Sequence, residues 1–167
     1  MVELKEEEMD DIEQEIMIMK ECKSPFIVGY NGTYYNKFQN KIWIVIEYCK
    51  GGSLSDMLFI TGIRFNEKVL VEIIASITLG LEYLHSCGII HRDLKAANVL
   101  ITADGCIRIA DFGVSAVLTE KRPKRKTAIG APFWMAPEVI QEQLYDCSAD
   151  IWSLGITLIE LAETKPP

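Results

Sequence analysis

Polar residues of the types and spacing needed for chemistry lie close together in one part of the chain. Residues 91–98 read HRDLKAAN, and a DFG tripeptide begins at Asp111. Asp93 is a candidate base for the proton of a substrate hydroxyl, and Lys95 is a candidate cation for the γ-phosphate. Asn98 and Asp111 offer the oxygen ligands that Mg²⁺ prefers. Together these tasks are those of phosphoryl transfer.

Each of these residues also has an ordinary structural interpretation. An aspartate in a turn often accepts backbone hydrogen bonds, and Asn98 taken alone is about equally well explained as a local turn or cap. The order of the motifs decides between the two, because a third motif, APE at residues 136–138, follows at a suitable interval. We therefore predict that the catalytic residues are Asp93, Lys95, Asn98 and Asp111.

The same motifs resemble those of the eukaryotic protein kinases. Residues 130–140 read GAPFWMAPEVI and residues 149–156 read ADIWSLGI, which is similar to the sterile-twenty group, in its Hippo-like (mammalian sterile-twenty-like) or germinal-centre kinase branch. The resemblance implies an α+β, bilobal protein-kinase-like fold. It also implies a transferase that uses ATP and Mg²⁺ to phosphorylate protein substrates. Lys95 favours Ser/Thr hydroxyls as acceptors, since tyrosine kinases usually carry Arg or Ala near this position.

The resemblance implies a nucleotide site between two lobes. Ile46 matches the gatekeeper, the Glu47 carbonyl and the Cys49 backbone match the hydrogen-bond partners of adenine, and Leu100 matches an apolar floor under the base. Asn98 and Asp111 would hold Mg²⁺ against the phosphates. As bare sequence, Ile46 and Leu100 are simply core residues in strands, and the two interpretations are compatible.

Four regulatory residues are also implied by the resemblance. Glu15 matches the helix glutamate that pairs with a strand lysine, although on its own it would be solvated surface of an acidic helix. Phe112 matches a member of a stacked apolar spine together with His91. Thr127 matches an activating site, phosphorylated by an upstream kinase or by the protein itself, and its phosphate would pair with Arg92. The alternative for Thr127 is an unmodified exposed threonine.

The elements that must position these residues follow from apolar periodicity and turn residues. Helices are predicted over residues 10–22, 66–86 and 148–162, the second with Asn66 as its N-cap. Strands are predicted over residues 26–35, 41–48, 99–101 and 106–110. Residues 119–130 lack periodicity and are predicted to form an exposed loop.

On the kinase pattern the chain divides into the remainder of a small lobe at residues 1–48, a hinge at 49–52 and part of a large lobe at 53–167. The chain has 167 residues, whereas a kinase domain runs to roughly 250–300. The glycine-rich phosphate loop and the strand lysine of the pattern are not in the sequence. We therefore expect a truncated, partial domain that is weak or inactive alone. The alternative is a pseudokinase or scaffold fragment that binds partners without catalysis.

The composition and charge of the chain limit the classes of protein to which it can belong. The chain is 49% hydrophobic and 25% charged, as is usual for a globular protein, and its net charge of −7 argues weakly against binding to nucleic acid or a membrane surface. The strongly apolar stretch at residues 42–46 is too short to span a bilayer. The five cysteines are widely spaced and form no CxxC, which indicates free thiols rather than zinc ligands. Cytoplasmic signalling, implied by the resemblance, agrees with free thiols.

One position departs from the family pattern. The family usually has Gly-Thr-Pro where this chain has Gly130, Ala131 and Pro132. The expected threonine hydroxyl bridges Asp93 and Lys95, which an alanine side chain cannot do. Losing such a hydrogen bond costs about 1 kcal/mol and loosens the site. This substitution predicts an enzyme that is slower than its relatives, or specialised.

Overall fold

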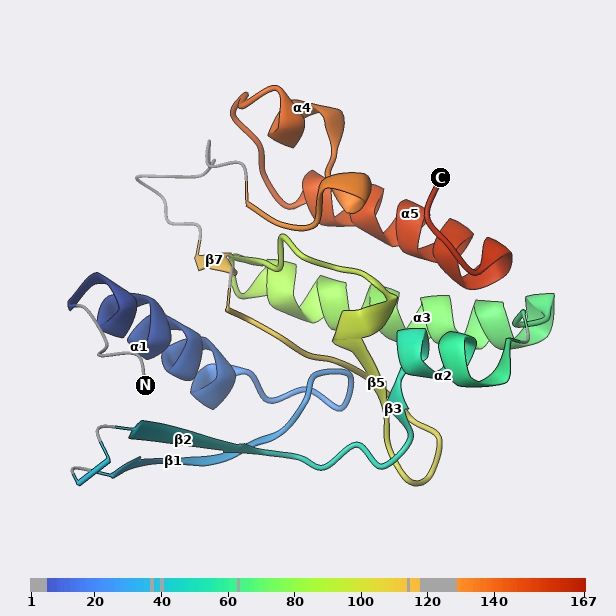
Figure 1. The fold of residues 1–167 in the computed structure, drawn as a ribbon. Helices are drawn as coiled ribbons and strands as arrows, with labels where there is room; N and C mark the ends of the chain where they lie inside the picture. The colour runs from blue at the N-terminus through green and yellow to red at the C-terminus, as the bar shows by residue number, and fades with distance from the viewer. Residues whose placement is uncertain (1–5, 37, 40, 63, 114, 118–128) are drawn as a thin grey trace.

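The computed structural model describes residues 6–36, 38–39, 41–62, 64–113, 115–117 and 129–167 (Figure 1). In chain order its elements are α1 (Glu6–Glu21), β1 (Tyr30–Asn36), β2 (Lys41–Ile46), β3 (Gly52–Ser53), α2 (Leu54–Thr61), α3 (Glu67–Ser86), β4 (Ile89–Ile90), β5 (Val99–Ile101), β6 (Ile107–Ile109), β7 (Ala116–Val117), α4 (Pro137–Ile140) and α5 (Ser148–Glu163). Short 3₁₀ turns cover Ala96–Asn98 and Pro132–Trp134.

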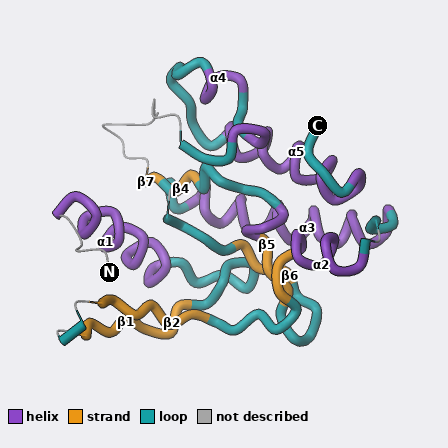
Figure 2. Tube along the Cα trace, in the orientation of Figure 1, coloured by secondary structure: helices purple, strands orange, loops and turns teal. Residues whose placement is uncertain are grey.

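The strands form three small antiparallel sheets rather than one large sheet. β1 pairs with β2, β5 lies between β3 and β6, and β4 pairs with β7. In Figures 1 and 2, α1 and the β1–β2 hairpin form one part of the molecule, and α3 and α5 run beside each other in the other part. This arrangement confirms the predicted α+β, kinase-like fold class. The division of the chain at residues 49–52 stays a prediction.

α3 is the main core helix. The Asn66 side chain accepts a hydrogen bond from the Val69 amide at 3.0 Å, so the predicted N-cap is confirmed. Within the described residues α3 is the helix whose length and composition would allow it to cross a membrane. However, its apolar face is buried against β4, β6 and α5, as expected for a helix in a protein core. The buried residues of this face include Ile73, Ile77, Leu81 and Leu84.

The largest differences between the predicted and observed boundaries are at the starts of α1 and β1. α1 begins at Glu6 rather than near residue 10, and β1 begins at Tyr30 rather than at residue 26. The backbone of residues 26–28 bonds to β6 instead of β2, because the Ile109 amide donates to the Phe26 carbonyl and the Val28 amide donates to the Ile109 carbonyl. This segment therefore joins the β1–β2 hairpin to the sheet formed by β3, β5 and β6. The predicted loop at residues 119–130 lies mostly outside the described residues.

α5 carries a stripe of polar residues that are nearly inaccessible to solvent. Asp150 and Thr157 are 0% exposed, Ser153 is 5% exposed and Glu160 is 8% exposed. Their spacing of three, seven and ten residues places them along one face of the helix. Buried polar groups are costly unless they are hydrogen-bonded. The partners of these four side chains therefore show which segments α5 must hold in place.

Candidate functional site

The Asp150 carboxylate fixes the start of the loop that contains residues 91–98, the catalytic loop. Its Oδ2 accepts the His91 amide and its Oδ1 accepts the Arg92 amide, both at 2.9 Å. Arg92 has a φ of 70°, a left-handed conformation that is uncommon for a residue other than glycine. The two bonds hold this unfavourable backbone turn. His85 Nε2 donates to Oδ2 at 2.7 Å, so three donors surround a fully buried carboxylate.

Glu160 of the α5 stripe holds the rest of the catalytic loop, because its Oε2 accepts the Ala96 amide at 3.0 Å. The Thr157 hydroxyl donates to the Ser153 carbonyl of its own helix at 2.7 Å and packs against the loop, 3.4 Å from the Leu94 carbonyl oxygen. Leu94 and Ala96 are both 0% exposed. The loop is therefore attached to one rigid helix on both sides of Asp93.

Both oxygens of Asp93 accept hydrogen bonds. Lys95 Nζ and Asn98 Nδ2 donate to Oδ2 at 2.7 and 3.0 Å, and the Ala131 amide donates to Oδ1 at 2.8 Å. These three donors fix the plane of the carboxylate. The structure thus brings Asp93, Lys95 and Asn98 together, and it adds a backbone donor from a segment 38 residues further along the chain.

The DFG motif lies directly against the catalytic loop. Phe112 is 2% exposed, and its ring meets the His91 ring edge-on with centroids 5.6 Å apart. His91 Nε2 bonds to the Ala110 carbonyl, and Nδ1 accepts the Asp93 amide. Because Nδ1 is the acceptor, the geometry fits a neutral ring with its proton on Nε2. The backbone of Asp111 is left-handed, with a φ of 66°.

Most of the predicted nucleotide-site residues line one cavity of about 340 Å³. Glu47 and Cys49 are not among the residues that line it. The Glu47 side chain instead accepts hydrogen bonds from the Gly29 amide at 3.1 Å and from Arg108 Nε at 3.2 Å. Partial burial, and then the Glu47 carboxylate, raise the pKa of the Cys49 thiol. The predicted site residues that do line the cavity are Glu15, Ile46, Asn98, Leu100 and Asp111.

Asn98 and Asp111 fit a hard divalent cation. Asn98 donates its amide hydrogens to the backbone carbonyl and side chain of Asp93, which leaves its amide oxygen available as a ligand. Asp111 adds a carboxylate that is exposed to solvent and accepts the Gly113 amide with one oxygen. Oxygen donors of this kind suit Mg²⁺. Across the described part of the chain no three His, Cys, Asp or Glu side chains gather as a metal site.

α1 brings Glu15 to the DFG motif. Glu15 Oε2 lies 3.7 Å from the position that a Cβ on Gly113 would occupy. Partial burial, and then the charge of Asp111, raise the pKa of the Glu15 carboxyl. No ion pair of Glu15 with a lysine or arginine occurs among the residues that the structure describes. Two carboxyl groups therefore face the same cavity.

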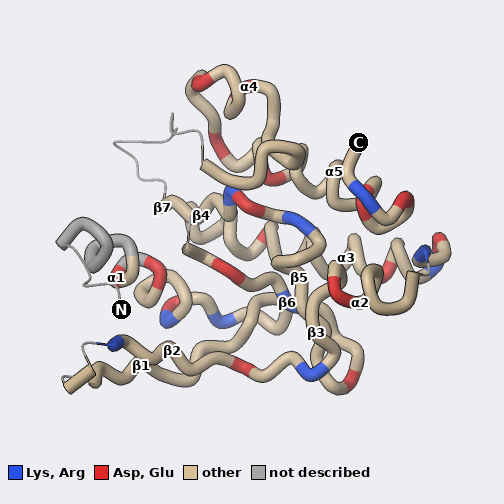
Figure 3. Tube along the Cα trace, in the orientation of Figure 1, with Lys and Arg blue, Asp and Glu red and all other residues tan. Residues whose placement is uncertain are grey.

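Of the two remaining regulatory residues, Arg92 lies within the part of the chain that the structure describes. Arg92 Nη2 donates to the Ser115 carbonyl at 3.1 Å, which ties the catalytic loop to this segment. Thr127 lies outside the described residues, so its predicted pairing with Arg92 stays a prediction. In Figure 3 the segment between β4 and β5 carries adjacent basic and acidic positions, as expected for a site that must both bind and orient charged groups.

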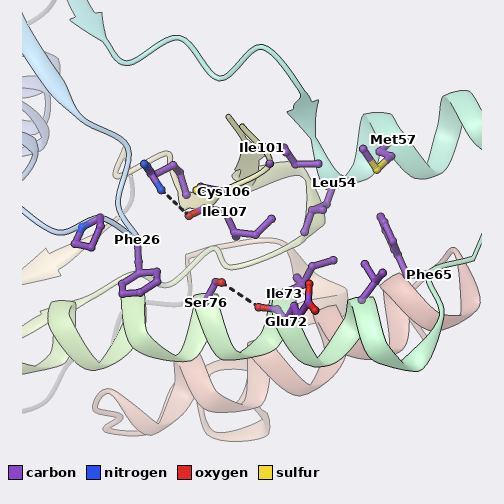
Figure 4. A pocket seen from close by; sticks show the side chains of 14 residues that line it. Phe26, Leu54, Met57, Phe65, Glu72, Ile73, Ser76, Ile101, Cys106 and Ile107 are labelled. Carbon is purple, nitrogen blue, oxygen red and sulfur yellow. Dashed lines mark hydrogen bonds between the residues drawn. The ribbon is translucent and has the colours of Figure 1, made fainter. Parts of the chain in front are cut away.

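A larger cavity of about 520 Å³ lies elsewhere, between α2, α3 and the β5–β6 turn (Figure 4). Its lining is mostly apolar and includes Met57, Phe65, Ile73 and Ile107. None of the motif residues lines this cavity. We therefore assign the chemistry to the smaller cavity, because that cavity contains the oxygen ligands.

Comparison with protein families agrees with this geometry. A model of the protein kinase domain matches residues 1–167. The chain belongs to the protein kinase family. Kinases of this family are transferases that act on protein substrates, and the family implies ATP and a divalent metal as cofactors. In this kinase the residues that fit the metal are Asn98 and Asp111.

Several residues that shape this kinase site were not predicted from the sequence. Ser153, Thr157 and Glu160 belong to a helix whose apolar residues dominate its pattern, although their spacing with Asp150 was a detectable signal. His85 was not among the predicted site residues, yet it donates to Asp150. Its partner is 65 residues away in the chain, so no local pattern indicated the contact.

The raised pKa of Glu15 predicts how stability depends on pH. A carboxyl group whose pKa is raised on folding stabilises the folded state at low pH, and this stability is lost as pH rises through the folded pKa. Above that pKa the charged Glu15 repels Asp111. Glu15→Gln should therefore raise the melting temperature at pH 7, with the gain disappearing as pH falls below the ordinary value of 4.5.

Thermal unfolding of Glu15→Gln between pH 3 and pH 8 measures this effect. Glu13→Gln, on the exposed side of α1, is the matched control. A melting temperature for Glu15→Gln that is lower than wild type at pH 7 would contradict the assigned repulsion.

The close approach of Gly130 to the catalytic loop predicts that a side chain at this position destabilises the fold. Gly130 has a φ of 130°, and a Cβ there would lie 2.3 Å from the Arg92 carbonyl oxygen. Gly130→Ala should push this segment away and break the bond from the Ala131 amide to Asp93. Gly62→Ala is the control, since Gly62 has a φ of 62° and a Cβ there would meet no other atom within 4 Å.

Urea unfolding measures how much each of the two substitutions lowers the free energy of unfolding. The free energy of unfolding should fall by about 1–3 kcal/mol more in Gly130→Ala than in Gly62→Ala. Gly130→Ala adds a clash with the backbone, and its φ of 130° lies outside the left-handed region that alanine can adopt at Gly62. Equal losses would show that the segment does not press on the catalytic loop.

Proposed function

We propose that this kinase is a serine/threonine protein kinase of the sterile-twenty group, acting in cytoplasmic signalling. The observation that carries the proposal is the Asp93 carboxylate, which is held by Lys95, Asn98 and the Ala131 amide beside the cavity that Asn98 and Asp111 line. A carboxylate fixed in this way can orient a hydroxyl nucleophile and accept its proton. Because phosphoryl transfer depends on positioning and charge neutralisation, a rigid site is what the reaction needs.

The chain's own residues divide the work of the reaction. Asp93 orients the substrate hydroxyl and takes its proton, and Lys95 stabilises negative charge on the transferred group. Mg²⁺ held by Asn98 and Asp111 would supply charge neutralisation at the phosphates of ATP. Ile46 and Leu100 would enclose the adenine. The Glu47 carbonyl and the Cys49 backbone remain the proposed hydrogen-bond partners of the base.

Sequence features support the finer parts of the proposal. Lys95 favours serine and threonine as acceptors, and residues 130–140 favour the sterile-twenty group. All five cysteines are free, which agrees with a reducing cytoplasm. Thr127 is the proposed site of activation by an upstream kinase or by self-phosphorylation.

We further propose that these 167 residues are weakly active when alone. Glu15 faces the cavity without a paired cation in the described part of the chain. The family resemblance places a lysine opposite this glutamate, where it contacts the phosphates. Without that cation the triphosphate is held less firmly.

A second candidate function is a pseudokinase or scaffold that binds partners without catalysis. Two features favour it: Glu15 has no paired cation among the residues that the structure describes, and position 131 is an alanine. The geometry around Asp93 favours catalysis, because three donors fix its carboxylate beside the cavity that Asn98 and Asp111 line, as a catalytic base requires.

A phosphorylation assay with radiolabelled Mg-ATP and mixed Ser, Thr and Tyr peptides tests the proposal. We expect label on serine and threonine only, and Asp93→Asn should lower the rate by about 100-fold or more through loss of the base. Asp104→Asn, in the exposed β5–β6 turn, is the control. A Mg-ATP-dependent rise in melting temperature without any transfer would favour the scaffold, and label on tyrosine would refute the Ser/Thr assignment.

Ala131→Thr tests the departure from the family pattern. The Ala131 amide already donates to Asp93 Oδ1, and a threonine hydroxyl would add a contact between Asp93 and Lys95. We expect turnover to rise by about 3- to 10-fold, the effect of one added hydrogen bond. Ala131→Val, with similar size and no hydroxyl, is the matched control. Turnover equal to wild type in Ala131→Thr would rule out this explanation.

A further inference from the structure

Glu160 is a buried carboxylate with donors from two different segments. It is 8% exposed, and its Oε2 accepts the Ala96 amide at 3.0 Å and the Trp134 indole Nε1 at 2.9 Å. No lysine or arginine pairs with it among the described residues. A buried carboxylate without a counter-ion depends on its hydrogen bonds, so each of the two donors matters.

The two donors come from the two segments that must meet for catalysis. Ala96 directly follows Lys95 in the catalytic loop. Trp134 ends the 3₁₀ turn Pro132–Trp134, just after Ala131, whose amide contacts Asp93. The two segments therefore meet twice, once directly at Asp93 and once through Glu160.

Trp134 is itself held firmly on α5. The Ser153 hydroxyl donates to the Trp134 carbonyl at 2.8 Å, while the Trp134 indole donates to Glu160. The two contacts lie seven residues apart on the same face of α5, which is about two helical turns. The backbone and the ring of Trp134 are thus both fixed to the helix that carries the catalytic loop.

We propose that Glu160 is a positioning residue that couples the segment ending at Trp134 to the catalytic loop. The Trp134 N–H holds the carboxylate where the Ala96 amide can reach Oε2, and the Ala96 amide in turn fixes the loop next to Lys95. When Trp134 leaves its place, Glu160 is free to rotate, and the loop loses one of its attachments to α5. The inference rests on the proposed function, because it takes Asp93 and Lys95 as the groups that need positioning.

The test compares two tryptophan-to-phenylalanine variants. Trp134→Phe keeps an aromatic ring and removes the N–H donor. Trp152→Phe is the matched control, since Trp152 is part of α5, the helix that holds Trp134, and is 47% exposed. The first measurement is backbone amide hydrogen exchange at Ala96, which requires no catalytic activity.

We expect exchange at Ala96 to be about tenfold faster in Trp134→Phe, as for the loss of one hydrogen bond to a buried charged group, and unchanged in Trp152→Phe. Glu160→Gln keeps the shape and one acceptor oxygen, so it should cause a smaller increase. Faster exchange confined to residues 129–140, with Ala96 unchanged, would overturn the coupling and leave Trp134 with a local structural role. Where Trp134→Phe does not fold, Glu160→Gln with unchanged exchange at Ala96 overturns it equally.

Kinetics separate this inference from the proposed function. In an active kinase, Trp134→Phe should lower kcat about tenfold and change the KM for ATP less than about twofold, because the loop positions the base rather than the nucleotide. Faster exchange at Ala96 in a protein that transfers no phosphate would support the coupling and refute the proposed function. Wild-type exchange and wild-type kcat in Trp134→Phe would refute the coupling alone.

Discussion

The cost of burying the Asp150 carboxylate is the constraint on which the site depends. A fully buried carboxylate is tolerated only when donors surround it, and its three donors come from the last turn of α3 and from the first two residues of the catalytic loop. Satisfying this one group therefore sets both the packing of α3 on α5 and the left-handed turn at Arg92. From Asp150 to Glu160 the helix rises by about 15 Å, enough to support the loop along its length.

The two carboxylates at the cavity are arranged differently from those buried on α5. Asp111 and Glu15 face each other without the dense set of donors that surrounds Asp150, and their repulsion adds to burial in raising the pKa of Glu15. Such a pair is suited to receiving a cation together with a charged ligand, whereas Asp150 and Glu160 are suited to holding backbone in place. The carboxylates that are suited to binding a ligand are thus different from the carboxylates that position the backbone. Phe112 and His91, buried edge to face, connect the two sets.

Local patterns in the sequence were sufficient wherever the contact is local. The Asn66 cap, the two strands around the β5–β6 turn and the cluster of Asp93, Lys95 and Asn98 all involve residues within a few positions of each other. The start of β1 was predicted wrongly because the backbone of residues 26–28 bonds to β6, which no periodicity in that segment reveals. The bonds from Trp134 and Ala96 to Glu160 cross 26 and 64 residues, so only the folded structure shows them.

Amide hydrogen exchange at His91 and Arg92 in an Asp150→Asn variant tests the central claim most directly. An asparagine keeps the size of the side chain, but one oxygen becomes an NH₂ group that cannot accept a hydrogen bond from an amide. If Asp150 holds the catalytic loop, exchange at one or both amides should become at least about tenfold faster while the middle of α3 stays protected. Exchange at both amides equal to that of the wild type would contradict the account, because the loop would then keep its shape without the buried carboxylate.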